Sequence, residues 1–504
     1  MHALTAPLSE LAEIEEIYGE RGREPGMLLL SGCVTSQKTH MMYALGKGYA
    51  RTLIVLSSED KAKKLYEEYR FLNENTSYYP AKDLLFYQAD IHGKQLVKQR
   101  METLQMMMEA EAESQVTVIT TIDGFMDELP PEAEVKGDIL TISNGEAVEF
   151  ESLKEKIVKL GYDREAQVDG PGQFAVRGGI IDIYPLTEEL PIRIEFWEDE
   201  VDSIRTFDVD SQRSVENLEQ IVIYPADDRL GSDRKVSFIN YFDPKDTLVF
   251  LDEPARLLEK GRLAENEVEK ARENRAEEMA RTGEMEEAPE FFATDEIVKF
   301  LNRFCMIGMC ALEMKCKPFF VRKRFGIQAK SVNPYNSSFE MLTQDLKRLK
   351  RNGYRAVLIS GSRTRAKRLA EDLRDYDLSS FYSEDQEREV KPGEIMVCYG
   401  HIEVGYEYPM IKFIVISESD IFGKTKKKKK RKSYDGQKIS SFSDLKPGDY
   451  VVHENHGLGI YRGIEKIEVD KVTKDYMKIS YADGGNLYIL ATQLDQIQKY
   501  ASAD

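Results

Sequence analysis

Apolar and polar residues alternate along two neighbouring stretches in the middle of the chain, Phe174–Tyr184 and Ile192–Trp197. A period of two is typical of strands that bury one face, so both stretches are predicted to be strands. Pro185 and Pro191 frame a polar turn between them. Over residues 125–225 such short alternating segments recur, which predicts a separate α+β module.

The first 124 residues follow another pattern, in which short continuous apolar runs alternate with helical periodicity. Apolar residues three and four positions apart predict a helix over residues 4–18, and further helices run to about Gly48 and over Asp60–Phe71. Buried-type strands are predicted at Met27–Leu30, Thr52–Leu56 and Val116–Thr120. This order of elements predicts a parallel sheet with helices on both faces.

Residues 226–504 hold three further predicted units. The first, 226–330, combines a buried strand at Thr247–Leu251 with a highly charged, solvated helix over 256–288. The second, 331–418, repeats the α/β rhythm and predicts a small doubly wound domain. The third, 441–504, is rich in strands with glycine turns and predicts a small twisted barrel. The second unit is built from helices Met341–Lys350 and Arg363–Leu373 and strands Ala356–Ser360, Ile395–Tyr399 and Phe413–Ser417.

Length and composition fit this multidomain α/β class. The chain has 504 residues and a formal net charge of −19, enough for three to five domains. An acidic surface does not wrap nucleic acid, whose phosphates require a basic footprint, so any DNA contact must be local. There is no apolar run long enough for a membrane span and no secretory signal at the N-terminus. The five cysteines match no zinc pattern, so they are predicted to be reduced, buried residues, and we expect no metal.

The two central strands carry Arg177, Arg193 and Trp197. An enzyme site, in contrast, usually gathers His, Cys or carboxylate side chains in a cleft. Arginine and tryptophan dominate the energetics of protein–protein contacts, so these strands are predicted to form a docking surface. Arginine forms bidentate pairs with carboxylates, which predicts an acidic partner surface. The alternative is that the two arginines pair with carboxylates on neighbouring strand positions, such as Asp182, Glu195 or Glu198.

A near match to a phosphate-binding loop follows the first predicted strand. In the pattern G-x-x-x-x-G-K-[ST], backbone N–H groups cradle phosphates while the lysine and hydroxyl meet phosphate oxygens and Mg²⁺. Gly32, Lys38 and Thr39 fit this pattern, but Gln37 replaces the second glycine. Asp252 and Glu253, after a buried strand, resemble the acidic pair that would hold Mg²⁺. One hypothesis is an ATPase with an insertion between its halves; the other is a nucleotide-binding scaffold that no longer hydrolyses ATP, with weak nucleotide binding left open.

The stretch R-G-G-I-I-D-I-Y-P followed by F-D-V-D-S-Q-R, over 177–213, resembles domain 2 of the bacterial transcription-repair coupling factors (Mfd), which is shared with the excision-repair protein UvrB. The resemblance implies that Arg177, Arg193 and Trp197 bind UvrA. It also implies UvrB-like domains 1a (1–124), 2 (125–225) and 1b (226–330), with decayed ATPase motifs, followed by a domain 3 (331–418).

The segment K-P-G-D-Y-V-V-H-E-N-H-G-L-G-I-Y-R-G-I, from 446 on, resembles the RNA polymerase-interacting domain of the same family, a fold shared with CarD-type regulators. The family pairs a strand of this barrel with a strand of the polymerase β subunit, and such pairing takes affinity from backbone hydrogen bonds. Gly463–Val469 matches that strand, with Ile467 as the main contact and Glu465 and Lys466 beside it. Without the resemblance, this strand is an ordinary edge protected by charge.

A run of like charge over 424–432 lies within residues 419–440, which we expect to be a flexible linker. A transient DNA contact through this run is the alternative, and high salt would weaken such a contact steeply.

Together the resemblances predict a cytoplasmic bacterial adaptor that links stalled RNA polymerase to UvrA in nucleotide excision repair. In the family a translocase motor, with its ATP and Mg²⁺ and most of the DNA contact, and a C-terminal regulatory domain follow the barrel. We therefore expect a truncated form that recruits without enzymatic activity or cofactor of its own, with its UvrA surface exposed. The competing hypothesis is a P-loop ATPase or helicase fragment that hydrolyses ATP; UvrB itself is disfavoured by the barrel.

Overall fold

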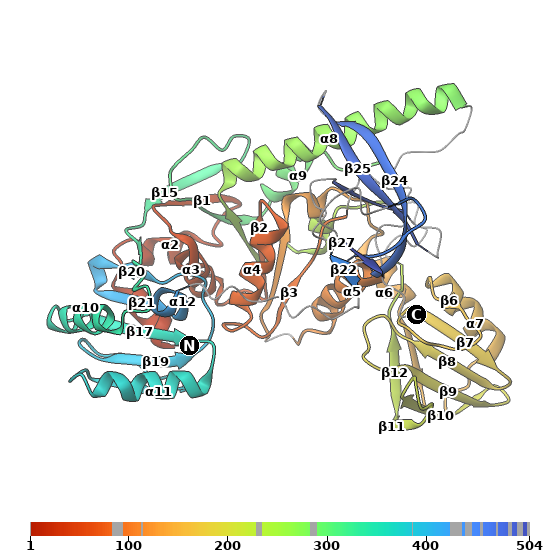
Figure 1. Ribbon diagram of the computed structural model, residues 1–504, viewed down its shortest axis with the longest axis horizontal. Coiled ribbons are helices and arrows are strands. Elements are labelled where there is room, and N and C mark those ends of the chain that lie inside the picture. The colour runs from red at the N-terminus through yellow and green to blue at the C-terminus, as the bar shows by residue number, and fades with distance from the viewer. Residues whose placement is uncertain are drawn as a thin grey trace.

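The computed structural model describes residues 2–82, 94–111, 114–227, 234–282, 290–385, 387–423, 436–438, 446–453, 457–469, 472–481, 486–490 and 497–500. It is an α/β multidomain structure with a central parallel sheet, an inserted module, a second α/β sheet and a C-terminal antiparallel sheet (Figure 1). Residues 424–432, with their run of like charge, lie outside the described residues, as does most of the linker predicted over 419–440.

The central sheet has seven parallel strands in the order β15-β1-β14-β13-β2-β4-β3. The predicted strands are present as β1, β2, β4 and β13, each a fully or almost fully buried run. Strands β3, β14 and β15 were not predicted from the sequence. The bounds are β1 Gly26–Ser31, β2 Arg51–Leu56, β3 Thr76–Tyr78, β4 Val116–Thr121, β13 Thr247–Asp252, β14 Cys305–Met309 and β15 Val321–Gly326.

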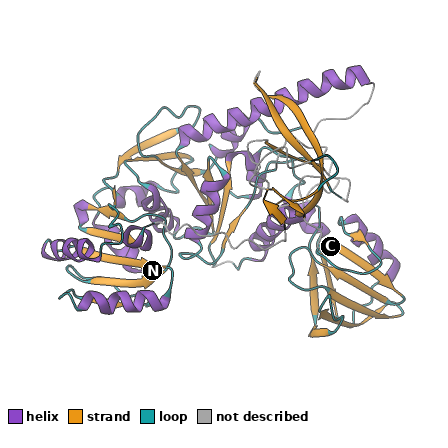
Figure 2. Cartoon of the chain, viewed as in Figure 1, coloured by secondary structure: helices purple, strands orange, loops and turns teal. Residues whose placement is uncertain are grey.

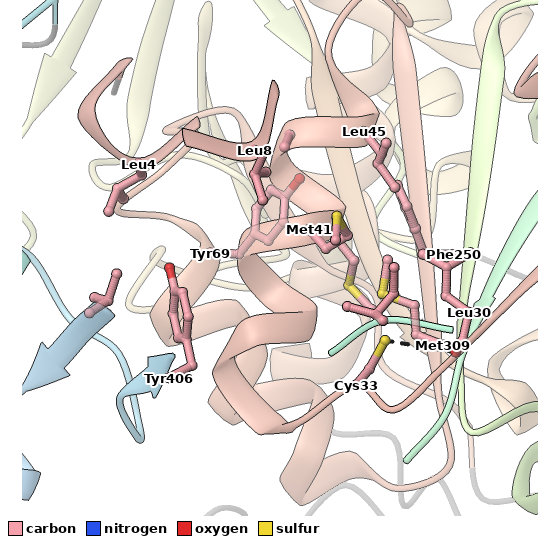
Figure 3. Packing of buried hydrophobic residues seen from close by; sticks show 14 of the residues in the cluster. Leu4, Leu8, Leu30, Cys33, Met41, Leu45, Tyr69, Phe250, Met309 and Tyr406 are labelled. Carbon is pink, nitrogen blue, oxygen red and sulfur yellow. Dashed lines mark hydrogen bonds between the residues drawn. The ribbon is translucent and has the colours of Figure 1, made fainter. Parts of the chain in front are cut away.

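Helices cover both faces of this sheet because successive strand side chains point to opposite sides. Leu28 and Ile54 pack with α3 and α4 on one face, and Met27 and Leu53 pack on the other with α5, α8 and α9. Figure 3 shows the first of these cores, between Leu30, Met41 and Phe250. The bounds are α3 Thr35–Gly46, α4 Glu59–Tyr69, η3 Ile122–Phe125, α5 Lys94–Glu109, η4 Phe238–Tyr241, α8 Pro254–Thr282 and α9 Thr294–Leu301.

The prediction of one continuous N-terminal helix over residues 4–18 is wrong. The chain forms α1 (His2–Thr5), a 3-10 turn η1 (Ala6–Glu10) and α2 (Ile14–Glu20). Pro7 lies in the first turn of η1, and a proline cannot supply the N–H that an uninterrupted α-helix requires there.

The inserted module carries a six-stranded sheet in the order β11-β10-β9-β8-β7-β6. Helix α7 (Phe150–Lys159) covers one face, where Leu153 and Ile157 pack against strand residues such as Ile183 and Ile194. The module, at the lower right of Figure 1, lies well away from the second α/β sheet. The remaining bounds are α6 Glu132–Asp138, β5 Leu140–Ser143, β6 Asp163–Arg164, β7 Gln173–Arg177, β8 Ile180–Tyr184, β9 Ile192–Trp197, β10 Glu200–Phe207, β11 Ser214–Leu218 and β12 Gln220–Ile223.

The second α/β sheet has the order β16-β20-β21-β17-β19-β18, with a parallel core to which β20 and then β16 are added by antiparallel pairing at one edge. Helices α10 and α11 pack on one face, whereas the other face joins the core of the central module through residues such as Val357 and Phe413. The expected doubly wound domain is therefore covered on its second face by the N-terminal segment. The bounds are β16 Lys330–Ser331, α10 Phe339–Arg351, β17 Arg355–Ser360, α11 Arg363–Arg374, β18 Ser380–Tyr382, β19 Ile395–Tyr399, β20 Tyr406–Tyr408, η5 Pro409–Ile411, β21 Phe413–Ser417 and α12 Glu418–Phe422.

The C-terminal residues form one curled antiparallel sheet in the order β22-β27-β23-β24-β25-β26, drawn in orange beside the long helix α8 in Figure 2. Strands β24 and β25 are long and paired from Ile460–Ser480 to Val469–Val472. The bounds are β22 Gly436–Lys438, β23 Tyr450–His453, β24 Gly457–Val469, β25 Val472–Ser480, β26 Asn486–Leu490 and β27 Ile497–Tyr500.

Candidate functional site: a closed nucleotide loop and two docking surfaces

The near-match to a phosphate loop lies between β1 and α3, as the sequence predicts, but its backbone is committed to protein partners. Gly32 has a φ of +78°, and a Cβ at this position would lie 2.2 Å from the backbone oxygen of Ile327. Its N–H donates to the carbonyl of Ala311, and the N–H of Cys33 donates to the carbonyl of Cys310. A phosphate loop needs such N–H groups free for the ligand, so here the glycine serves close packing within the protein.

Gln37, which replaces the second glycine of the pattern, fills the loop with its own side chain. It is completely buried. Its Oε1 accepts from the N–H of Val34 at 3.1 Å, and its Nε2 donates to the hydroxyl of Tyr408, on β20 of the second sheet, at 3.1 Å. The amide group thus ties the loop to the second α/β sheet.

Lys38 points at the acidic pair at the end of β13, Asp252 and Glu253. Its Nζ lies 2.6 Å from Asp252 Oδ1 and 2.7 Å from Glu253 Oε1, and the Lys38 side chain is 11% exposed. Burial acts to lower the pKa of Lys38, but the two carboxylates outweigh burial and the pKa is raised. Glu253 Oε1 also accepts from the N–H of Ala311. The lysine and the acidic pair that would meet phosphate and Mg²⁺ are paired with one another instead.

The hydroxyl of Thr39 is directed to Glu68, a buried carboxyl on α4. Ser36 Oγ donates to Glu68 Oε2 at 3.1 Å, and the backbone N–H of Glu403, in the loop between β19 and β20, donates to the same oxygen at 3.2 Å. Burial raises the pKa of Glu68 to about 7, against the lowering effect of these hydrogen bonds. The structure therefore brings together all six predicted loop residues. The loop lies where the central module packs against the second α/β unit.

The raised pKa of Glu68 predicts a pH dependence of stability. Because the folded state binds the proton more tightly than the unfolded chain, this group's contribution is full below about pH 4.5 and is lost as the pH rises to about 7. We expect Glu68→Gln to gain thermal stability relative to wild type as the pH rises from 4 to 8, by about 1.4 kcal/mol per unit of pKa shift. Thermal unfolding across that range measures the difference, with the exposed Glu67→Gln as the matched control; a pH-independent difference would contradict the assignment.

The predicted docking residues of the inserted module share one face of its sheet. The strand register pairs Asp182 with Arg193, Arg177 with Ile180, and Ile180 with Glu195. Arg177, Arg193 and Trp197 therefore fall on the face opposite the one that packs on α7. Residue alternation gives Arg193 and Trp197 a common face from the sequence, whereas the position of Arg177 depends on the register.

Both arginines pair with Asp182, as the alternative interpretation expects. Arg193 Nε lies 2.6 Å from Asp182 Oδ1, and Arg177 Nη2 lies 2.6 Å from Asp182 Oδ2. The Arg177 side chain is still 48% exposed, whereas that of Arg193 is 12% exposed and lies over the ring of Phe207 at 4.5 Å. Pairing leaves Arg177 available at the surface, so it does not decide against docking.

Trp197 is 76% exposed at the end of β9, where the chain turns into β10 through Glu198, a residue with φ of +55°. An indole of this size gains little where it stands, since its apolar surface remains in water. The side chain is thus presented by the hairpin and takes no part in the core.

The predicted polymerase strand is the second half of β24. Glu465 faces Tyr476, Lys466 faces Asp475 and Ile467 faces Lys474 on β25. Glu465 forms an ion pair with Lys478 at 2.9 Å. On its other side β24 pairs with β23 only over 457–460, with two further backbone hydrogen bonds at Tyr461. Within the described strands, 463–469 is therefore paired along one edge alone.

Sequence reasoning missed residues that hydrogen-bond to the predicted site residues or their neighbours and hold them in place. Tyr408 and Glu68 could not be identified from the local sequence pattern, because their partners Gln37 and Ser36 are distant in sequence. Asp182 was considered only as an alternative partner, although alternation along β8 places it on the arginine face. In the described ranges no group of three or more His, Cys, Asp or Glu side chains could hold a metal ion, and no helix is long and apolar enough to cross a membrane.

Comparison with known proteins finds a family match in each of the two units that are predicted to dock. The model of the UvrB interaction domain matches residues 140–228, and that of the CarD-like/TRCF RID domain matches residues 445–501. The chain is 28% identical to the transcription-repair-coupling factor of Bacillus subtilis (strain 168), over 94% of this chain and 45% of that protein. It is 27% identical to that of Staphylococcus haemolyticus and 25% identical to that of Staphylococcus aureus (strain MRSA252), each over 98% of this chain and 46% of the relative. The chain thus spans about half the length of the curated relatives it matches.

Proposed function

We propose that this chain, whose resemblance to the N-terminal portion of transcription-repair coupling factors the comparisons confirm, is a two-ended adaptor of nucleotide excision repair. One end, the inserted module, binds UvrA; the other, the C-terminal sheet, binds the β subunit of RNA polymerase. The observation that carries the proposal is the sheet face that presents Trp197, 76% exposed, together with the half-exposed Arg177.

On the UvrA side, this face combines a large apolar side chain, Trp197, with the cation of Arg177. Arg177 donates one N–H group to Asp182, and its other N–H groups are proposed to bind the partner. Tryptophan and arginine in this arrangement fit an acidic surface with an apolar pocket, which is the usual make-up of a binding hot spot.

On the polymerase side, residues 463–469 of β24 offer backbone groups along one edge that no described strand pairs. Such an edge accepts a strand from another protein, with backbone hydrogen bonds giving affinity and alternate side chains giving specificity. Ile467, Glu465 and Lys466 lie on this stretch.

The finer architecture belongs to the same proposal. We assign residues 1–124, 125–225 and 226–330 to UvrB-like domains 1a, 2 and 1b, 331–418 to domain 3 and 441–504 to a CarD-like barrel. The adaptor works in the bacterial cytoplasm, and DNA is engaged chiefly by the motor of full-length relatives, which also uses ATP and Mg²⁺.

We further propose that the central module performs no ATP chemistry and needs no cofactor of its own. Support comes from Lys38, which is paired with Asp252 and Glu253, and from Gln37, which occupies the loop. The competing ATPase would have to break these contacts before phosphate could enter.

Substitution of Ile467 tests the polymerase end in the full chain. We expect Ile467→Glu to weaken binding to the isolated polymerase β subunit by at least tenfold, because a charge enters the edge that would receive the partner strand. Biolayer interferometry with immobilised β subunit measures this. UvrA binding by the same variant is the internal control and should be unchanged; equal loss of both partners would indicate misfolding, and unchanged β-subunit binding would refute the assignment of this edge.

A further inference from the structure

Asp182 lies beneath the docking face, at the centre of β8. Its side chain is 2% exposed, and its two oxygens accept three hydrogen bonds from the arginines. Arg193 takes both oxygens, from Nε at 2.6 Å and from Nη2 at 2.8 Å, and Arg177 Nη2 adds a third bond at 2.6 Å. One carboxylate thus fixes two guanidinium groups side by side.

The guanidinium of Arg193 has further contacts besides Asp182. Arg193 Nη2 also donates to Gln212 Oε1 at 3.0 Å, and its guanidinium carbon lies 4.5 Å from the centre of the Phe207 ring. The Asp182 hydrogen bonds raise the pKa of Arg193, so the group remains a cation. Neither Arg193 Nη1 nor the remaining N–H groups of Arg177 are engaged by Asp182. The cluster therefore holds two cations and one anion on the sheet face that also carries Trp197.

We propose that Asp182 is a positioning residue of this docking surface: it orders Arg177 and Arg193 in advance, so that their free N–H groups meet a carboxylate of the partner together. The inference rests on the proposed function of the face as the UvrA contact. An arginine side chain loses rotamer freedom when it is fixed. A side chain ordered before binding spares the complex that loss.

If Asp182 positions the arginines, removal of its carboxylate should lower the affinity for the partner. If only its charge matters, the same removal should raise the affinity. Asp182→Asn makes the face more positive, which by charge alone should strengthen binding to an acidic partner. If Asp182 works by holding the arginines, the same change weakens binding, because an amide cannot accept all three bonds and its NH₂ group faces the arginine donors.

The test is binding of purified UvrA to the full chain by surface plasmon resonance. We expect Asp182→Asn to weaken binding about tenfold, mainly through faster dissociation. The matched control is Glu195→Gln, which adds the same charge to the same face but removes a partner of Arg205 instead; it should bind as wild type or slightly tighter. Asp182→Asn binding as tightly as Glu195→Gln would overturn the proposal.

A double-mutant cycle separates positioning from general damage to the fold. With Arg177→Ala already present, Asp182→Asn should lose several-fold less than in the wild-type background, because one of the two groups it orders is gone. Additive losses would show that Asp182 acts independently of Arg177 and would overturn the positioning role. If Asp182→Asn does not fold, Gln212→Asn replaces it: asparagine tolerates the φ of +58° at this position but is too short to hold Arg193.

For Gln212→Asn we expect about threefold weaker binding with faster dissociation, and unchanged binding would count against the proposal. A wild-type chain that fails to bind UvrA would sink the proposed function itself, whatever the variants do.

Discussion

Arg177→Glu is expected to lower the affinity of the full chain for UvrA by roughly 100-fold or more. The substitution removes the most exposed cation of the docking face and places a carboxylate beside Asp182, which then repels both its neighbour and an acidic partner. Titration by isothermal calorimetry or plasmon resonance measures the loss, and binding to the polymerase β subunit should be unchanged.

The control for this prediction is Arg164→Glu. Arg164 is an exposed residue on β6, the edge strand of the same sheet, and its reversal changes the net charge of the module equally. Long-range charge steering alone would make both variants lose affinity to a similar degree. Intact UvrA binding by Arg177→Glu would remove the assignment of this face as the UvrA contact.

Lys38→Ala is expected to destabilise the central module by about 3 kcal/mol, because it leaves Asp252 and Glu253 facing each other without their shared cation at a mostly buried position. For a unit of this size the thermal midpoint should fall by roughly 6–12 °C. Calorimetry of the full chain measures the midpoint, and hydrogen exchange over residues 247–253 localises the effect.

Two further measurements distinguish this structural role from a catalytic one. Lys61→Ala is the matched control: Lys61 Nζ lies 3.5 Å from Asp252 on a side chain that is 41% exposed, so its loss should cost less than about 1 kcal/mol. A phosphate-release assay then measures ATP hydrolysis directly, and a fluorescent-nucleotide titration measures nucleotide binding. A Lys38→Ala chain of unchanged stability that had lost a measurable wild-type turnover would favour the ATPase hypothesis.

The two proposed docking ends differ in how much of each could be predicted from the sequence alone. At the proposed UvrA end, residue types and alternation pick out Arg193 and Trp197 on one face, and the structure adds that Arg177 joins them through the β7–β8 register. At the proposed polymerase end, the strand itself could be predicted, but the extent of its unpaired edge follows only from where β23 stops pairing with β24.

The sequence by itself determined the elements whose signal is local. Strands β1, β13 and β17 are short, mostly apolar and buried runs, whose length favours a strand over a helix. The replacement of the loop glycine by Gln37 is likewise visible in the sequence and indicates a changed loop. Strand β15 was missed, since it is mostly polar and its place at the edge of the sheet depends on a partner far away along the chain. Strand β14 was also missed, although it is a buried apolar run like β1.

Only the tertiary structure decided what the changed loop does and what holds the docking arginines. Gln37 meets Tyr408 across 371 positions of sequence, and Lys38 meets Asp252 across 214. Hydrophobic periodicity is a property of neighbours and fixes which face of an element is buried. Which distant face it meets depends on the crossover connections and strand register, and these create the joint at Gln37 and the shared carboxylate at Asp182.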